Sequence, residues 1–137
     1  MLSPHELVKE VSKFLAKDYI CYVHRASREL TEIEISKIDT PENQVLVSQL
    51  EGKISRYIKC KPMPTQDMIW VMKNFLLEMT DDELGKELSS GLNRKKPTRN
   101  FLQILESRPD IKQHWSLFKA EQYEDYVAEL FIKDYNY

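Results

Sequence analysis

The sequence predicts an α+β protein in which a small antiparallel sheet of about three strands packs against a C-terminal cluster of about four helices. Three observations favour this class. Segments rich in β-branched and aromatic residues, or alternating apolar with polar residues, occur within residues 19–61. Apolar residues recur at helical spacing from residue 65 onward. The chain has only three glycines, which argues against an all-β fold with many tight turns and against a glycine-rich phosphate loop.

The N-terminal segment predicts a helix from Pro4 to about Lys17. Ser3 can cap this helix, Pro4 suits the first helical position, and Glu6 completes a capping box. One apolar stripe follows at helical spacing, formed by Leu7, Val8, Val11, Phe14 and Leu15.

Two strands joined by a hairpin are expected next. Residues 19–25 are rich in β-branched and aromatic side chains. In residues 30–38, Ile33 and Ile35 alternate with polar residues, which is typical of a strand with one solvated face. The connecting residues Ala26-Ser27-Arg28-Glu29 are few enough for a hairpin, although they lack the favoured Asn-Gly or Asp-Gly pair.

A second helix and a third strand complete the predicted N-terminal half. Thr40 before residues 45–50 and Gly52 after them indicate a short helix with a cap and a stop. Residues 53–61 then alternate and predict a strand, which Pro62 ends because proline cannot donate to a ladder. The apolar side of this strand is expected to hold Ile54, Ile58 and Cys60.

The remainder predicts four helices, over residues 65–79, 80–90, 98–106 and from 109 onward. In the first of them, Ile69 and Leu77 are expected to widen the apolar face. The second is expected to end at Ser90-Gly91, since glycine often terminates helices. Aromatic residues on successive apolar stripes are expected to form one core: Phe75, Phe101, Trp115 and Phe118.

Length and composition fit one globular domain. All 137 residues are expected to share one core, with residues 1–64 carrying the first helix and the sheet and residues 65–137 the helical part. The formal net charge of -2 gives no bulk attraction to nucleic acid or anionic membranes. No apolar stretch approaches the ~20 residues that span a bilayer, and the N-terminus has no signal-peptide core. We therefore expect a cytoplasmic protein in which Cys21 and Cys60 stay reduced.

Several C-terminal residues resemble a known family. They are Met72-x-x-Phe75, Leu84, Leu88, the segment Lys96 to Phe101, Trp115-x-x-Phe118 and Tyr123. This pattern is similar to the C-terminal signature of uncharacterised protein family 0158, from Met68 to Leu130, while the N-terminal part matches in outline as a helix followed by a hairpin. Family members typically carry Thr-Gly or a similar turn where this chain has Ala26 to Glu29, which leaves the strand register open. The resemblance implies a small bacterial cytoplasmic protein, and it transfers no catalytic or binding residues.

No catalytic or metal-binding motif is found. His5, His24 and His114 are scattered, and none has the HExxH spacing that would place two metal ligands on one helix face. GxSxG, Walker A and GxGxxG sequences are absent from the chain. The acidic pair Asp81-Asp82 is explained by favourable charge at a helix N-terminus. We expect a protein that is not an enzyme and that uses no cofactor or metal.

Two basic segments are the candidate anion-binding site. Residues 53–61 and residues 92–100 each hold four cations and no acid. The candidate residues are Lys59, Lys61, Arg94, Lys95, Lys96 and Arg99. If the two segments converge, they form a positive patch that can bind phosphates despite the overall negative charge. The alternative is a solvated connector, with cations that complement a helix C-terminus and an Arg99 that pairs with an acidic helix.

Two functions from different classes are therefore predicted. The first is a non-catalytic cytoplasmic interaction domain that self-associates or binds a protein through exposed aromatics such as Tyr135 and Tyr137. The second is a weak nucleic-acid or phosphate-binding module that uses residues 53–61 and 94–99.

Overall fold

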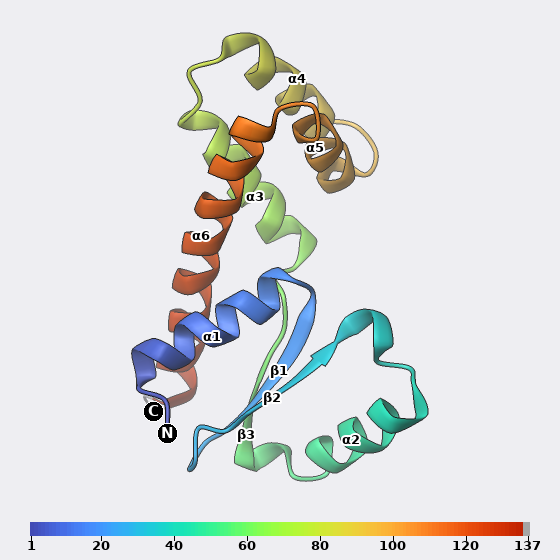
Figure 1. Cartoon of the computed structure of the whole chain (residues 1–137), viewed down its shortest axis with the longest axis vertical. Helices are drawn as coiled ribbons and strands as arrows, with labels where there is room; N and C mark the ends of the chain where they lie inside the picture. Colours follow the sequence, from blue (N-terminus) through green and yellow to red (C-terminus); the bar gives the residue numbers. More distant parts are fainter. Residues whose placement is uncertain (136–137) are drawn as a thin grey trace. The chain divides into compact units, whose positions relative to one another are not determined.

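The computed structural model describes residues 1–135, with the backbone alone described at Tyr135. Over these residues the elements follow the predicted order, α-β-β-α-β and then four helices, which confirms the α+β class (Figure 1). The helices are α1 (Pro4–Ala16), α2 (Pro41–Glu51), α3 (Thr65–Leu77), α4 (Asp82–Leu92), α5 (Pro97–Leu105) and α6 (Pro109–Tyr135). The strands are β1 (Tyr19–His24), β2 (Leu30–Glu34) and β3 (Tyr57–Cys60).

The chain divides into two compact units. Unit 1 comprises Met1–Pro62 and the last part of α6, from Tyr123 onward, and unit 2 comprises Met63–Gln122. Unit 1 holds α1, α2 and the sheet, whereas unit 2 holds α3, α4, α5 and the first part of α6. The expectation of one domain over residues 1–137 stays a prediction.

The sheet of unit 1 is antiparallel, with strand order β2-β1-β3. In its register, Cys21 of the central strand lies opposite Glu32 on β2 and opposite Cys60 on β3. The predicted hairpin is confirmed. Its turn is closed by Arg28, whose backbone φ of 59° provides the left-handed conformation that glycine usually supplies. The Arg28 backbone N–H donates to the His24 carbonyl at 2.8 Å.

Two predicted strands are shorter than expected. Residues Ile35–Lys37 form a 3-10 turn, because β1 begins at Tyr19, the partner of Glu34. One further bond joins the two segments, from the Ile35 N–H to the carbonyl of Asp18 at 2.9 Å, and the left-handed φ of 64° at Asp18 then turns the chain away. Likewise Ile54–Arg56 form a 3-10 turn, since β1 ends at His24, the partner of Tyr57. Ile54 is accordingly exposed instead of lying on the apolar face of the sheet.

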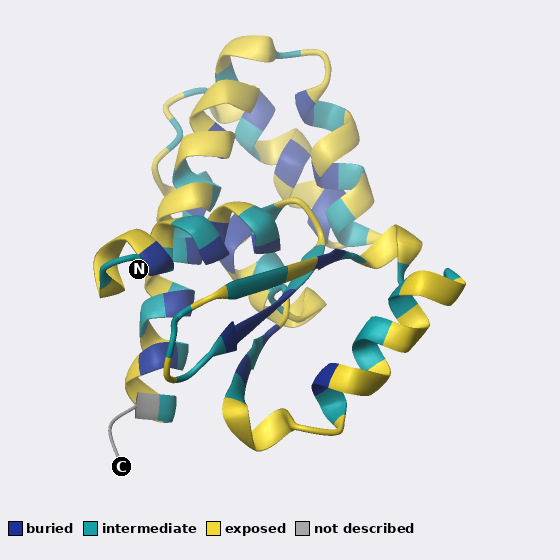
Figure 2. Cartoon of the chain, turned by 60° about the horizontal axis from the view of Figure 1, so that its bottom comes forward, coloured by how far each residue is buried: buried dark blue, intermediate teal, exposed yellow. Residues whose placement is uncertain are grey.

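Two helices of the N-terminal half cover the sheet. On one face Tyr22 and Ile33 pack against Leu50 of α2, and on the other α1 contacts β1, with the Phe14 and Tyr19 rings 5.2 Å apart. Figure 2 shows the resulting buried band along the strands and the exposed outer side of α2. The last part of the C-terminal helix α6 belongs to the same unit. There the Tyr126 hydroxyl donates to the Lys61 carbonyl, just after β3, at 3.3 Å, and Arg25, just after β1, pairs with Asp134 at 3.7 Å. The sheet thus packs against a C-terminal helix as well as against α1 and α2.

Unit 2 is a helical cluster around an aromatic core. The Phe75 ring lies 5.4 Å from that of Trp115, and the Phe101 ring lies 5.0 Å from it. The predicted grouping of these residues with Phe118 is confirmed. However, α4 runs through Gly91 instead of ending there. A Cβ at that position would lie 3.0 Å from the Ile104 side chain, so Gly91 allows α4 and α5 to approach closely.

No helix within residues 1–135 is both long enough and apolar enough to cross a bilayer.

Candidate functional site

A groove in unit 2 lies between α3 and α4 and has a volume of about 660 Å³. Its apolar surface comes mainly from Leu76, Leu77, Met79 and Leu92. One lysine from each helix, Lys73 and Lys86, and an acidic pair at the start of α4 add charge. The groove thus combines apolar side chains with charged side chains of both signs, as surfaces that receive amphipathic segments often do.

The helix face of α3 that contributes Lys73 and Leu77 to the groove also carries Trp70, and its large apolar residues are exposed to solvent. Trp70, Lys73 and Leu77 follow the i, i+3, i+7 spacing and share one helix face. The opposite face packs Val71 and Phe75 into the core. Trp70 is 63% exposed and Leu77 is 83% exposed. The prediction that Leu77 widens the buried face was therefore wrong, because the core of unit 2 reaches α3 from one side.

On the α4 side of the groove, Asp81 caps the N-terminus of the helix. The Asp81 carboxylate accepts the Leu84 backbone N–H at 2.9 Å and pairs with Arg108 at 3.0 Å. Both donors lower the pKa of Asp81 below its ordinary value, and the hydrogen bond from the Leu84 backbone N–H is the larger cause. Four residues on, Gly85 faces the groove, and a Cβ there would meet no atom within 4 Å. Glycine inside a helix lowers stability relative to alanine, and the space beside Gly85 is open.

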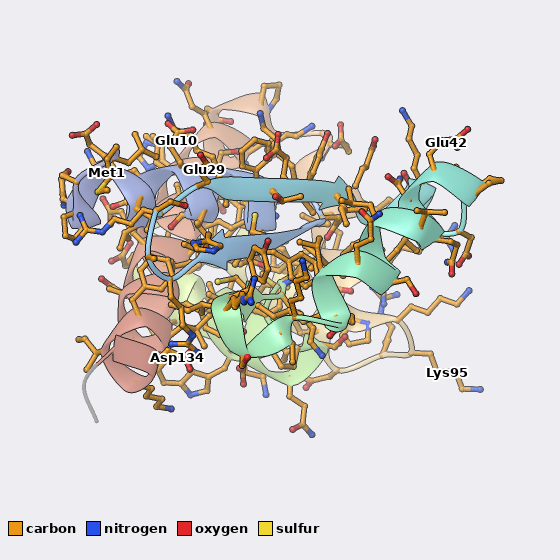
Figure 3. All side chains as sticks on the ribbon, turned by 90° about the horizontal axis from the view of Figure 1, so that it is seen from below. Met1, Glu10, Glu29, Glu42, Lys95 and Asp134 are labelled. Atoms are coloured by element: carbon orange, nitrogen blue, oxygen red, sulfur yellow. The ribbon has the colours of Figure 1, made fainter. Side chains whose placement is uncertain are left out.

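The second basic segment forms an exposed loop before α5. The Asn100 side chain donates to the carbonyls of Gly91 at 3.0 Å and Lys95 at 2.8 Å, which holds the loop in place. Lys96 adopts a left-handed φ of 56° at the N-cap of α5. Figure 3 shows the Lys95 side chain extending away from the ribbon. Within residues 1–135, no ion pair involves any cation of this segment: Arg94, Lys95, Lys96 and Arg99 are all exposed.

The first basic segment is different, because Lys59 already has a partner. The Lys59 ammonium donates to the Glu51 carboxylate at 2.5 Å and lies 5.6 Å from the centre of the Tyr22 ring. The Tyr22 hydroxyl donates to the same carboxylate oxygen at 3.0 Å. The bond from Lys59 is the main cause that lowers the pKa of Glu51, and it raises the pKa of Lys59. Lys61 is exposed.

The two basic segments belong to different units. Lys59 and Lys61 lie in unit 1, and the other four candidate residues lie in unit 2. Their convergence into one anion-binding patch stays a prediction.

The cysteines lie side by side in the sheet. Cys21 and Cys60 are register partners on adjacent strands, and both are buried free thiols, as predicted. Burial is the main cause that raises the pKa of both thiols, to about 12 for Cys60. Such thiols are poor nucleophiles, because the thiolate is the reactive form.

The remaining sequence candidates are dispersed. His24 accepts the Ser27 backbone N–H at 3.2 Å and so supports the hairpin turn. His5 and His114 are exposed at the starts of different helices. Among residues 1–135, no group of three or more His, Cys, Asp or Glu side chains is arranged to hold a metal ion. The Tyr135 side chain and Tyr137 lie outside the described residues.

Comparison with known proteins assigns the chain to a family. The sequence model of "Uncharacterised protein family (UPF0158)" matches residues 1–135. The chain belongs to UPF0158. The match includes the N-terminal half, so the resemblance predicted for the C-terminal half extends over both halves.

One UPF0158 relative is a curated protein from Pseudomonas aeruginosa, "UPF0158 protein PA5073", which is 24% identical over 80 residues. The aligned region covers 58% of this chain and 52% of that protein, so the chain spans about half the length of the relative. No solved structure matches the chain significantly.

Proposed function

We propose that this UPF0158 protein is a non-catalytic, cytoplasmic interaction domain whose α3–α4 groove binds an amphipathic helix of a protein partner. The observation that carries the proposal is the exposure of Trp70 and Leu77 on one face of α3, since Leu77 also lines the groove with Leu76, Met79 and Leu92. Tryptophan is enriched among residues that dominate binding energy, and large apolar residues in water favour an interface.

The charges of the groove favour an amphipathic partner. Lys73 on α3 and Lys86 on α4 suit acidic residues flanking the apolar face of a partner helix, and Asp82 suits a basic one. Asp81 contributes less, because it is already paired with Arg108. The open space at Gly85 leaves room for a side chain from that helix. A non-catalytic role is supported by the perturbed carboxylates of Asp81 and Glu51. Their pKa values are lowered by ion pairs and hydrogen bonds, the opposite of what a general acid requires.

The experiment is a pull-down with the intact protein and three variants. Leu77→Glu and Trp70→Ala alter the α3 face, and Val45→Glu changes an exposed residue of α2 as the matched control. We expect a specific protein to be recovered with the wild type and the control and to be lost with both α3 variants. All three variants should keep their stability within about 0.5 kcal/mol, since the changed residues are exposed.

The recovered protein should bind the purified chain directly, with at least tenfold weaker affinity for Leu77→Glu. Size-exclusion chromatography of the wild type alone tests self-association through the same face. Equal capture by all four proteins, or no specific capture and no self-association, would contradict the proposal.

A second candidate function is weak nucleic-acid or phosphate binding. It is favoured by the exposed Arg94, Lys95, Lys96 and Arg99 before and in the first turn of α5, where free backbone N–H groups add to the positive potential. Lys59 contributes less, because its charge is already paired with Glu51. The predicted patch thus depends mainly on the second basic segment.

Salt dependence tests this candidate. If the cations neutralise phosphates, the logarithm of the binding constant should fall linearly with the logarithm of salt concentration, by ~0.9 per duplex phosphate contacted. Replacing Lys96 and Arg99 by alanine should flatten that slope by about two units, while Lys9→Ala, which removes an exposed cation of α1 outside both basic segments, serves as a control. An absence of binding to single-stranded or duplex nucleic acid at low salt would exclude this function.

A further inference from the structure

A second cavity lies within unit 1, far in the sequence from the α3–α4 groove. It is bounded by the first turns of α1, the β1–β2 hairpin and the last turns of α6, and its volume is about 470 Å³. In Figure 1 these segments meet beside the marked chain ends. Cavities that bind small molecules usually have volumes of roughly 300–1,000 Å³.

The surface of the cavity is almost entirely apolar, and its lining residues include one arginine and one histidine. Leu7 and Phe131 form its buried floor, with exposed fractions of 1% and 7%, and Ile132 forms a wall that is 58% exposed. Arg28 and His5 are the titratable lining residues, and the lining includes no carboxylate. An apolar cavity with an arginine among its lining residues complements a molecule with an aliphatic chain and an anionic end.

Arg28 is held beside the cavity by the hairpin. Its left-handed backbone conformation closes the turn, and one guanidinium nitrogen donates to the Leu2 carbonyl at 3.3 Å. A guanidinium has five N–H donors in a planar fork, so this single bond leaves donors for a carboxylate. The acids nearest in sequence, Glu6 and Glu29, are exposed, and within residues 1–135 neither forms an ion pair with Arg28.

We propose that this cavity binds a medium-length aliphatic monocarboxylate, with the chain on the floor of Leu7, Val8 and Phe131 and the carboxylate on Arg28. The site lies outside the basic segments and the α3–α4 groove, so it is separate from the proposed partner-binding function. His5 adds a second donor to the lining, next to the N-terminus of α1, whose dipole also favours an anion.

Calorimetric titration of the intact protein with hexanoate, octanoate and decanoate, each below its micelle concentration, tests the proposal. We expect one binding site whose affinity rises with chain length by up to about fourfold per methylene, the value for full burial. Octanol, which has the same chain without the charge, should bind at least tenfold more weakly than octanoate, because a hydrogen-bonded ion pair is lost.

Variants separate the two parts of the site. Arg28→Gln should weaken octanoate binding about tenfold and leave octanol binding unchanged, whereas Arg56→Gln, an exposed arginine of the same unit, should leave both unchanged. Ala128→Trp should block the cavity and abolish binding of every chain length. Circular dichroism checks that each variant is folded, and Arg28→Lys, which keeps the charge, should recover part of the affinity.

Three results would overturn the proposal. The first is that no acid of the series binds the folded wild-type protein. The second is that octanol and octanoate bind equally, or that Arg28→Gln and Arg56→Gln behave alike. The third is a concentration-dependent dimer that Ala128→Trp abolishes while the acids do not bind, because the cavity would then belong to a contact between two copies.

Discussion

The two glycines of α4 give a sharp test of the packing in unit 2. Gly85 and Gly91 lie in one helix, yet a new Cβ meets open space at Gly85, whereas at Gly91 it would lie 3.0 Å from Ile104 Cδ1 and 3.3 Å from Asn100 Cβ. The same substitution, glycine to alanine, should therefore change stability in opposite directions. The comparison is matched, because both replacements add one methyl group to one helix.

The expected magnitudes follow from these distances. In a helix, alanine is favoured over glycine by roughly 0.8–1.0 kcal/mol, and nothing opposes this gain at Gly85. At Gly91 the gain is offset by overpacking, which typically costs ~1–3 kcal/mol. A shift of Asn100 would also weaken its bond to the Gly91 carbonyl, now 3.0 Å long, worth about 1 kcal/mol. We expect Gly85→Ala to stabilise the protein by about 0.5–1 kcal/mol and Gly91→Ala to destabilise it by about 1–2 kcal/mol.

Urea denaturation followed by tryptophan fluorescence measures this difference in unit 2 directly. The two tryptophans of the chain, Trp70 and Trp115, both lie in that unit. The denaturation midpoint should rise for Gly85→Ala and fall for Gly91→Ala, with an unchanged slope. A Gly91→Ala variant as stable as Gly85→Ala would refute the close approach of α4 and α5. Because Gly85 faces the α3–α4 groove, Gly85→Leu should in addition weaken partner binding while the protein stays folded.

Three further predictions concern the cores and the ion pair. Trp115→Ala should lower the free energy of unfolding by ~3–5 kcal/mol, since the side chain is 3% exposed among other aromatic rings, and an unchanged urea midpoint would contradict this placement. Alkylation followed by mass measurement, without reduction, should modify Cys21 and Cys60 slowly in the folded protein and both after unfolding; failure of both to react after unfolding would indicate a disulfide. The pKa of Glu51 is lowered by folding, so its contribution to stability is present above its unfolded value and is lost as the pH falls through the folded value. Because Lys59 and Glu51 are 31% and 37% exposed, that contribution should stay below about 1 kcal/mol, and Glu51→Gln should reduce the loss of stability measured between about pH 5 and about pH 3.

Local signals in the sequence were sufficient for the order and the starts of most elements. Ser3 and Thr40 accept backbone N–H groups at the first turns of α1 and α2, and each precedes a proline at the first helical position. In α4 the N-cap is Asp81, which accepts the Leu84 N–H, so this helix starts slightly later than the predicted residue 80. These contacts join residues three positions apart, so a short window of sequence contains both partners. The aromatic core of unit 2 was also predictable, because helical spacing alone places its members on inward faces.

The strand ends and the surfaces depend on residues that are distant in the sequence. A strand is paired only while its neighbour continues, so β2 ends where β1 begins and β3 begins where β1 ends. No pattern within residues 30–38 or 53–61 contains these limits. Lys59 is paired because the end of α2 brings Glu51 to it across the Tyr22 face of the sheet. The sequence around Lys59, a segment rich in cations, gave no indication that Glu51 is its partner.

The sequence by itself thus determined the α+β class, the helix starts, the buried aromatic residues and the family. The tertiary structure decided which apolar residues are left in water and which glycine is crowded. Trp70 and Leu77 follow the same helical spacing as a buried stripe, and they are exposed because the core of unit 2 contacts only the other face of α3. Spacing defines the faces of a helix, but the face that is buried is chosen by the elements that pack against it, and those lie elsewhere in the chain.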